Sequence, residues 1–327
     1  MFETLVKAGV IDVEPPSQER SCSIQVSKPT FWKFTQLTDT FVSTGAFKER
    51  RLDNVFETAR RLGIRHIELS SGLAYSSEIL SEVLSVRKEF HFLVHNYFPP
   101  AEKPFLLNLA SGNDSIRQSS LAFCRQALNF SAQIGSPLYS VHCGFTFDGD
   151  GSQLGQPSQL TLPRVSMDEA MANFISSLSI LLPLAEELDI ILAIENNAAA
   201  EFAVIDGKNL LGLGADADNL NFIFEQFDSD HLFLLLDLGH AKVNSSTLGQ
   251  SIDAMINLFQ DRIVALHISD NDGRNDLNWP LYPDSDLWPY INKMDSALRV
   301  IESYHADENI LMDQIRLLSD DFCPNSY

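Results

Sequence analysis

The sequence predicts one α/β domain built as a (β/α)8 TIM barrel, and three observations support this fold class. Short apolar runs of strand length alternate along the chain with longer segments of helical periodicity. Most of these runs are continuously apolar, which is typical of parallel strands that are buried on both faces. The 327 residues exceed a bare barrel of about 250 residues, and long loops with an N-terminal segment can absorb the excess. We therefore interpret residues 1–30 as an N-terminal extension and residues 31–327 as the barrel.

The clearest strand covers residues 232–237, where five apolar residues lead directly into Asp237. Similar runs bounded by turn residues predict the other strands. The eight predicted strands span residues 31–41, 64–70, 90–97, 138–143, 190–195, 232–237, 263–269 and 309–313. The helices predicted between them span residues 47–62, 76–88, 113–134, 166–188, 218–227, 250–259 and 287–304.

Capping residues mark the ends of several predicted helices. Gly63 and Gly135 follow the first and third of them, where a glycine commonly ends a helix in the left-handed conformation. Asp216 or Asp218 can cap the start of the helix over 218–227. The Gly-, Ser- and Gln-rich segment 145–163 is predicted to be a long loop, which is often functional.

Composition narrows the classes of function. The net charge of −21 would repel nucleic acids at long range, so we expect no nucleic-acid partner. No apolar run approaches the length of a membrane span, and the first residues do not resemble a signal peptide. The four cysteines are far apart and form no CxxC pair, which is typical of reduced thiols. We therefore expect a cytoplasmic protein with no membrane partner.

Acidic and imidazole side chains recur at or near the ends of the predicted strands. They are, in chain order, Glu68, His95, His142, Glu195, Asp237, His267 and Asp313. In a barrel the carboxyl ends of the strands meet at one face, which is where TIM barrels carry their active sites. Several buried carboxylates held together would repel one another unless a cation neutralises them.

These residues include a candidate ligand set for one divalent metal ion. Glu195, Asp237, His267 and Asp313 together offer oxygen and nitrogen atoms but no thiolate. Such a set favours Mn²⁺, Co²⁺, Mg²⁺ or Zn²⁺ and does not choose between them. The metal would polarise a carbonyl or hydroxyl group of the substrate.

Five short motifs carry a resemblance to a known family. They are VHNYF at 94–98, VHCGF at 141–145, AIENN at 193–197, LDLGH at 236–240 and LHISDNDG at 266–273. In this order and spacing they are similar to the xylose isomerase-like TIM-barrel superfamily. That superfamily includes sugar and sugar-phosphate isomerases and epimerases, and endonuclease IV. The resemblance covers the chain from about residue 50 to its end.

The resemblance implies a reaction as well as a fold. It implies that Glu195 and Asp313 bind the metal and also act as the acid/base pair. One would remove a proton next to a carbonyl and the other would return it, through an enediolate that the metal stabilises. His240 matches a histidine that contacts substrate. His95 and His142 match positions that line the substrate pocket in the isomerases and bind further zinc ions in endonuclease IV.

Further residues at the expected barrel mouth are candidates for substrate binding. Glu68 and Asn197 stand at strand ends, and Lys242 and Arg274 stand on loops where they could bind an anion. The expected partner is therefore a sugar or a sugar phosphate, in carbohydrate metabolism. The sequence leaves open whether the protein forms a homo-oligomer.

Two departures from the family pattern keep alternatives open. Asp313 stands where the family usually has Glu, and the side chain is one methylene shorter. The loop after His267 reads Asp276-Leu277-Asn278, where endonuclease IV has an Asp-x-His ligand pair. Asn278 is a poor zinc ligand, which argues against a trinuclear zinc nuclease. The alternatives are a metal-dependent phosphodiesterase of the endonuclease IV type, a dehydratase or hydrolase with the same metal site, and a non-catalytic barrel.

Overall fold

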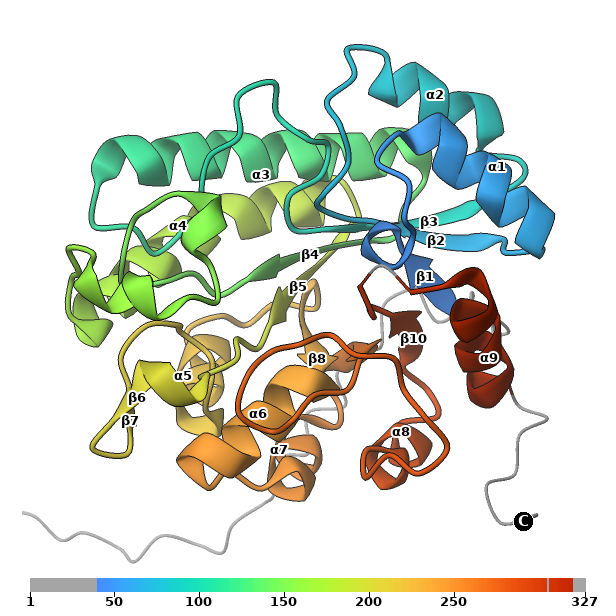
Figure 1. Cartoon of the computed structure of the whole chain (residues 1–327). Coiled ribbons are helices and arrows are strands. Elements are labelled where there is room, and N and C mark those ends of the chain that lie inside the picture. Colours follow the sequence, from blue (N-terminus) through green and yellow to red (C-terminus); the bar gives the residue numbers. More distant parts are fainter. Residues whose placement is uncertain (1–39, 305, 320–327) are drawn as a thin grey trace, which may run out of the picture.

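Eight parallel strands close into a barrel in the computed structural model, which describes residues 40–304 and 306–319 (Figure 1). The barrel strands are β1 (Phe41–Ser43), β2 (His66–Leu69), β3 (His91–His95), β4 (Leu138–His142), β5 (Ile191–Glu195), β8 (Leu232–Asp237), β9 (Ile263–Ile268) and β10 (Leu298–Ile301). Their order around the barrel is β1-β10-β9-β8-β5-β4-β3-β2, so neighbours in sequence are neighbours in space. The predicted (β/α)8 fold is confirmed. The predicted extension, residues 1–30, lies outside the described residues, as do residues 31–39 of the first predicted strand.

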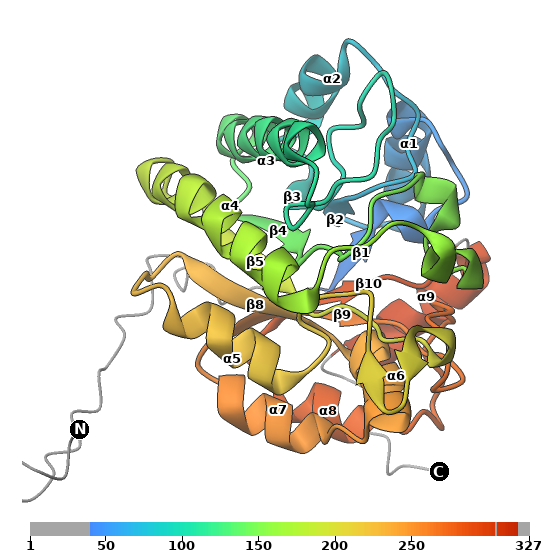
Figure 2. The ribbon, with the colours of Figure 1, turned by 90° about the vertical axis from the view of Figure 1, so that its left-hand side faces the viewer.

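Helices surround the barrel, and Figure 2 shows several of them around its strands. They are α1 (Leu52–Leu62), α2 (Ile79–Val86), α3 (Asp114–Ile134), α4 (Met167–Glu187), α5 (Ala217–Glu225), α6 (Leu238–Leu248), α7 (Ile252–Phe259), α8 (Trp288–Lys293) and α9 (Glu308–Leu318). The loop between β5 and α5 carries a small hairpin of β6 (Val204–Ile205) and β7 (Lys208–Asn209). Among the described helices, none combines the length and the apolar character needed to cross a membrane.

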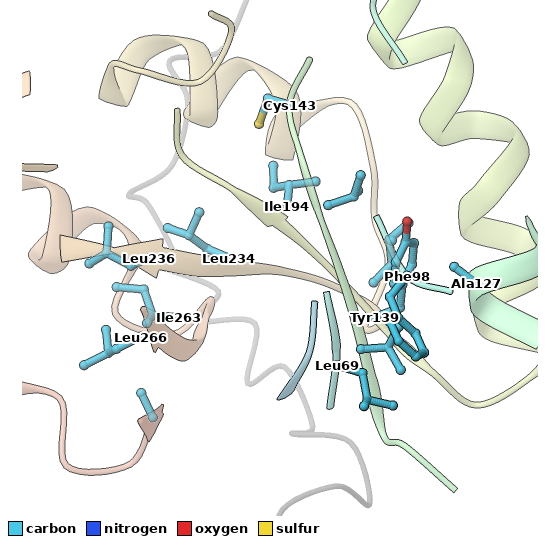
Figure 3. Packing of buried hydrophobic residues seen from close by; sticks show 14 of the residues in the cluster. Leu69, Phe98, Ala127, Tyr139, Cys143, Ile194, Leu234, Leu236, Ile263 and Leu266 are labelled. Atoms are coloured by element: carbon cyan, nitrogen blue, oxygen red, sulfur yellow. The ribbon is translucent and has the colours of Figure 1, made fainter. Parts of the chain in front are cut away.

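Side chains alternate between two cores along each strand. Outward residues such as Ile194 and Leu234 pack against the helices, and Figure 3 shows part of this layer, with Ala127 on α3. Inward residues, among them Leu138 and Ile191, form a second cluster inside the barrel. This alternation has a period of two, so the parity of a residue decides whether it faces the helices or the barrel axis.

The predicted capping residues end and begin helices as expected. Gly63 and Gly135 follow α1 and α3 with φ values of +76° and +78°. The carboxylate of Asp216 accepts a hydrogen bond from the backbone N–H of Asn219 and so caps α5. Helix α6 was not predicted from the sequence; it begins directly after β8 with no intervening loop.

The last two predicted elements are wrong. Residues 287–304 contain the short helix α8 and then strand β10, and residues 309–313 lie in helix α9. Buried Leu311 and Leu318 recur at helical spacing in α9, and Asp307 caps its first turn. A short apolar run fits a strand or a buried helical face equally well, so the run at 309–313 was misassigned. The residue after the true last strand is Glu302, which takes the place predicted for Asp313.

Candidate functional site

The candidate site lies inside the barrel at the carboxyl ends of the strands. Six of the predicted site residues lie at or next to strand ends. Each occupies a position whose side chain points into the barrel, and Glu302 does so directly after β10. The inward residues are Glu68, His95, His142, Glu195, Asp237, His267 and Glu302. All of them are buried except His142, which is half-buried.

Four of these residues form one compact group. The ligand atoms of Glu195, Asp237, His267 and Glu302 all lie within 4.8 Å of one another. The Nδ1 atom of His267 lies 2.8 Å from Glu302 Oε2, 3.2 Å from Glu195 Oε1 and 3.8 Å from Asp237 Oδ2. The group comes from β5, β8, β9 and the end of β10, which are adjacent in the barrel.

The chemistry of the group fits a divalent cation. Glu195 Oε2 and Asp237 Oδ2 are buried and accept no hydrogen bond within the described structure. Burial raises the pKa of Asp237 to about 6 and that of Glu302 to about 8, because a buried carboxylate lacks solvation and faces other carboxylates. A cation held by these oxygens and one imidazole nitrogen would remove that penalty. These residue groups can therefore hold a metal ion.

Asp237 is positioned by the helix that follows it. Its Oδ1 atom accepts a 2.7 Å hydrogen bond from the backbone N–H of His240 and caps α6. The side chain of Asn196 adds a second restraint, because its Oδ1 accepts a 2.7 Å hydrogen bond from the Asp237 N–H. One carboxylate oxygen is thus fixed by the helix, and the other, Oδ2, faces the ligand group.

Glu68 orients His267 from the opposite side of the imidazole ring. Glu68 Oε2 lies 2.9 Å from His267 Nε2, and both side chains are fully buried. This contact leaves Nδ1 of His267 directed at the three carboxylates, which is the usual way a carboxylate fixes a ligand histidine. Glu68 does not line the cavity described below, so its contact in the site is with His267.

Three histidines cover Glu195. Its carboxylate lies 3.5 Å from His95 Nε2, 3.2 Å from His142 Nδ1 and 3.7 Å from His240 Nδ1. Burial lowers the pKa of His95 to about 4, so that ring is neutral at physiological pH. Burial also raises the pKa of Glu195, but the imidazoles of His142, His95 and His267 outweigh burial and hold it well below its ordinary value.

His240 is linked to a carboxylate that sequence reasoning did not identify as a site residue. Its Nδ1 atom donates to the Asn196 carbonyl at 2.7 Å, and its Nε2 atom lies 3.2 Å from Asp276 Oδ2. Burial lowers the pKa of His240, but the charges of Asp237 and Asp276 outweigh it and raise the pKa well above the usual value. Asp276 comes from the loop after β9, and only the folded chain brings it to this ring.

A cavity of about 770 Å³ lies above this group. Its lining includes His95, His142, His240, Asn197 and Glu302, so most of the predicted substrate-binding residues border one space. The side-chain nitrogen of Asn197 donates to the carbonyls of Gly144 and Leu213, so this residue also joins two loops at the mouth.

Besides Glu68, three predicted residues neither line this cavity nor belong to the ligand group. Asp313 lies on α9 with 65% of its side chain exposed and pairs with Arg316, so its predicted position at the site is wrong. Lys242 makes two ion pairs of 2.7 Å, with Asp270 and Asp286, and does not line the cavity. The side chain of Arg274 is exposed and also lies outside the lining.

The glycine after β4 should be essential to the shape of the mouth. Gly144 has φ +88°, and a Cβ there would lie 2.8 Å from Ala110 Cβ and 3.1 Å from the Ala110 backbone nitrogen. Gly144→Ala is expected to destabilise the fold by about 1–3 kcal/mol, measured by chemical denaturation. Gly155→Ala is the matched control, because Gly155 also has a positive φ of +71° but open space around it. Equal losses in both variants would contradict the steric argument.

Comparisons with known proteins agree with this architecture. A family model described as xylose isomerase-like TIM barrel matches residues 56–291. No curated protein sequence matches the chain. Among solved structures, a D-tagatose 3-epimerase-like protein is similar at 20% identity and a TM-score of 0.65, covering 86% of this chain and 98% of that one.

Two further structures have the same fold. The 3-keto-D-glucoside 4-epimerase from E. coli has 14% identity and a TM-score of 0.60, covering 86% of this chain and 98% of its own. The D-psicose 3-epimerase from Clostridium cellulolyticum has 14% identity and a TM-score of 0.57, covering 86% of this chain and 97% of its own. At such identities the likeness demonstrates a shared fold.

Proposed function

Because the chain belongs to the xylose isomerase-like TIM-barrel family, we propose that it is a metal-dependent isomerase or epimerase of a sugar or sugar phosphate. The observation that carries the proposal is the buried group of Glu195, Asp237, His267 and Glu302 beneath a cavity. The names of the three similar structures support the same class, since each is a sugar epimerase or resembles one.

The four residues of this group would hold one divalent ion. The ion, when bound, would polarise the substrate carbonyl and make the neighbouring C–H more acidic. Glu68 would keep His267 in the ligand orientation, and the α6 backbone would keep Asp237 in place. Mn²⁺, Co²⁺, Mg²⁺ and Zn²⁺ all remain candidates for this donor set.

Two carboxyl groups would move the proton. Glu302 borders the cavity. We assign to its ionised form, which a bound cation would stabilise, the removal of the proton from the carbon next to the carbonyl. Glu195 lies at the end of β5, with β9 and β8 between it and the end of β10. After taking up a proton from solvent, it would return a proton to the substrate from another side. Return to the same carbon on the opposite face gives the epimer, and return to the neighbouring carbon gives the isomer.

The cavity histidines would bind the sugar. His142 and His240 both border the cavity, and imidazole nitrogens there can hydrogen-bond to substrate hydroxyl groups. Asp276 would hold His240 in its charged form, so that ring would donate rather than accept hydrogen bonds. These contacts would fix the carbon to be deprotonated beside Glu302.

Hydrogen exchange in heavy water tests this proposal. Metal-loaded protein is incubated in D₂O with a panel of ketoses, aldoses and their phosphates, and NMR follows the carbons next to the carbonyl. We expect deuterium to enter one such position, with formation of an epimer or isomer, only when metal is present. A complete panel with no exchange would contradict the proposal.

A second candidate function has one observation in its favour. The ligand atoms of His95, His142 and Glu195 form another group compatible with a cation. A second ion there would suit a metal-dependent phosphodiesterase, as in the endonuclease IV type. Cleavage of DNA containing an abasic site, lost in His142→Ala, would favour this candidate over the isomerase.

A further inference from the structure

The cavity above the ligand group has two chemically different sides. Its floor is formed by polar groups, among them the cavity histidines and Glu302. On another side, the loops after β4 and β5 contribute a set of large apolar side chains. This set, here called the apolar wall, consists of Phe145, Phe147, Leu154, Phe202 and Leu211.

The apolar wall is held in place by polar contacts behind it. The buried side chain of Asn108 donates to the carbonyls of Phe145 and Phe147 at 3.0 and 2.9 Å and accepts from the Phe145 N–H at 2.9 Å. The Thr146 N–H donates to the Leu211 carbonyl at 2.8 Å and joins the two loops. The wall is therefore a preformed surface, which lowers the entropy cost of binding against it.

The wall is only partly covered by the protein itself. Phe147 and Leu211 are buried in a small hydrophobic cluster with Leu106 and Ala203, whereas Leu154 is 40% exposed. Phe145 and Phe202 pack against that cluster and remain half-buried. Apolar side chains gathered on one side of a concave site gain stability when an apolar ligand group displaces water from them.

The charges around the cavity disfavour an anionic ligand. Among the described residues, neither Lys nor Arg lines it, whereas Asp276 and Glu302 do. Lys242 is engaged by Asp270 and Asp286. Among the histidines that line the cavity, only His240 has a raised pKa, and its imidazole is already paired with Asp276. A phosphate group would therefore meet two carboxyl groups, and no Lys or Arg in the described part of the lining would bind it.

We propose that the ligand of this cavity is an uncharged sugar that carries an apolar substituent, with the sugar on the polar floor and the substituent against the apolar wall. This inference rests on the proposed function for the sugar and on the wall for the substituent. The volume of about 770 Å³ agrees with it, since pockets of roughly 300–1,000 Å³ accommodate drug-sized ligands and leave room for a substituent beside the sugar.

A series of alkyl glucosides tests the inference by binding alone. Methyl, butyl and hexyl β-D-glucopyranosides are titrated calorimetrically into metal-loaded protein, below their micelle concentrations. Glucose and glucose 6-phosphate are the neutral and anionic comparators. We expect the affinity to rise two- to fourfold per added methylene, and glucose 6-phosphate to bind no more tightly than glucose.

Two variants locate the effect. Leu154→Asp should remove most of the dependence on chain length and leave the methyl glucoside affinity unchanged, because only the wall is altered. Leu258→Asp is the matched control, since Leu258 is 55% exposed on α7 and does not line the cavity. It should behave as the unmodified protein.

An affinity that does not change with chain length, equal behaviour of the two variants, or tighter binding of the phosphate would each overturn the inference. Because the measurement needs no turnover, the proposed function can stand when this inference fails. Conversely, a clear chain-length effect without hydrogen exchange in any sugar would remove the proposed function alone.

Discussion

Replacing Glu302 with Gln is expected to lower kcat by about 10²- to 10⁴-fold, because the reaction loses a positioned proton acceptor. Glu302 borders the cavity and its carboxylate lies 2.8 Å from His267. Burial already raises its pKa to about 8, so in the metal-free protein a neutral side chain is present at pH 7. Gln has nearly the same shape as that neutral form, and the variant should therefore fold.

Asp313→Asn is the matched control for this experiment. Asp313 lies on the exposed side of α9 and pairs with Arg316, and exposed ion pairs contribute about 0–1 kcal/mol. Its kcat and thermal midpoint should stay close to those of the unmodified protein. If Asp313→Asn abolished turnover while Glu302→Gln preserved it, the assignment of the last-strand carboxylate would be wrong.

Most of the barrel could be predicted from local patterns. Strands such as β5 and β8 are short, continuously apolar and closed by a carboxylate, so their type and their functional ends are both visible in the sequence. Strand residues alternate between the two faces with a period of two. Glu195, Asp237 and His267 therefore point into the barrel, like the apolar residues two positions before them.

The last strand could not be assigned in this way because its signal is weak. Only Val300 and Ile301 of β10 are fully buried, and Arg299 interrupts the apolar run. Residues 309–313 contain a longer apolar run, but Leu311 from this run and Leu318 beyond it lie on the buried face of a helix. A carboxylate was expected at the end of the last strand, and the structure has Glu302 directly after β10. Asp313 was named in its place because the wrong segment was taken as that strand.

Long-range pairing accounts for the other differences. Lys242 was expected to be available to an anion, but Asp270 and Asp286 hold its ammonium group. Asp276 matches the Asp of the endonuclease IV Asp-x-His pair but was not counted among the candidate site residues, and it meets His240 across 36 residues of sequence. Neither contact leaves a local pattern in the sequence, because the partners are far apart along the chain. Only the folded arrangement of the loops brings them together.

Replacing Asp237 with Asn should abolish tight metal binding without unfolding the protein. Asn can keep the N-cap of α6, because its side-chain oxygen also accepts the hydrogen bond from the His240 N–H. The variant loses the negative charge at Oδ2, the atom without a hydrogen-bond partner that faces His267. We expect elemental analysis to find one divalent ion per chain in the unmodified protein and far less in Asp237→Asn.

Thermal unfolding gives a second measurement of the same effect. A divalent ion at 100 times its Kd should stabilise the unmodified protein by about 2.7 kcal/mol and raise its Tm, because only the folded state holds the ligands together. Asp216→Asn is the matched control, since Asp216 caps α5 in the same way but is not part of the ligand group. Its Tm should rise with metal as in the unmodified protein, whereas Asp237→Asn should not respond. A metal response that survives in Asp237→Asn would show that the ion binds elsewhere. Two or three zinc ions per chain, with binding lost in His142→Ala, would instead favour the phosphodiesterase.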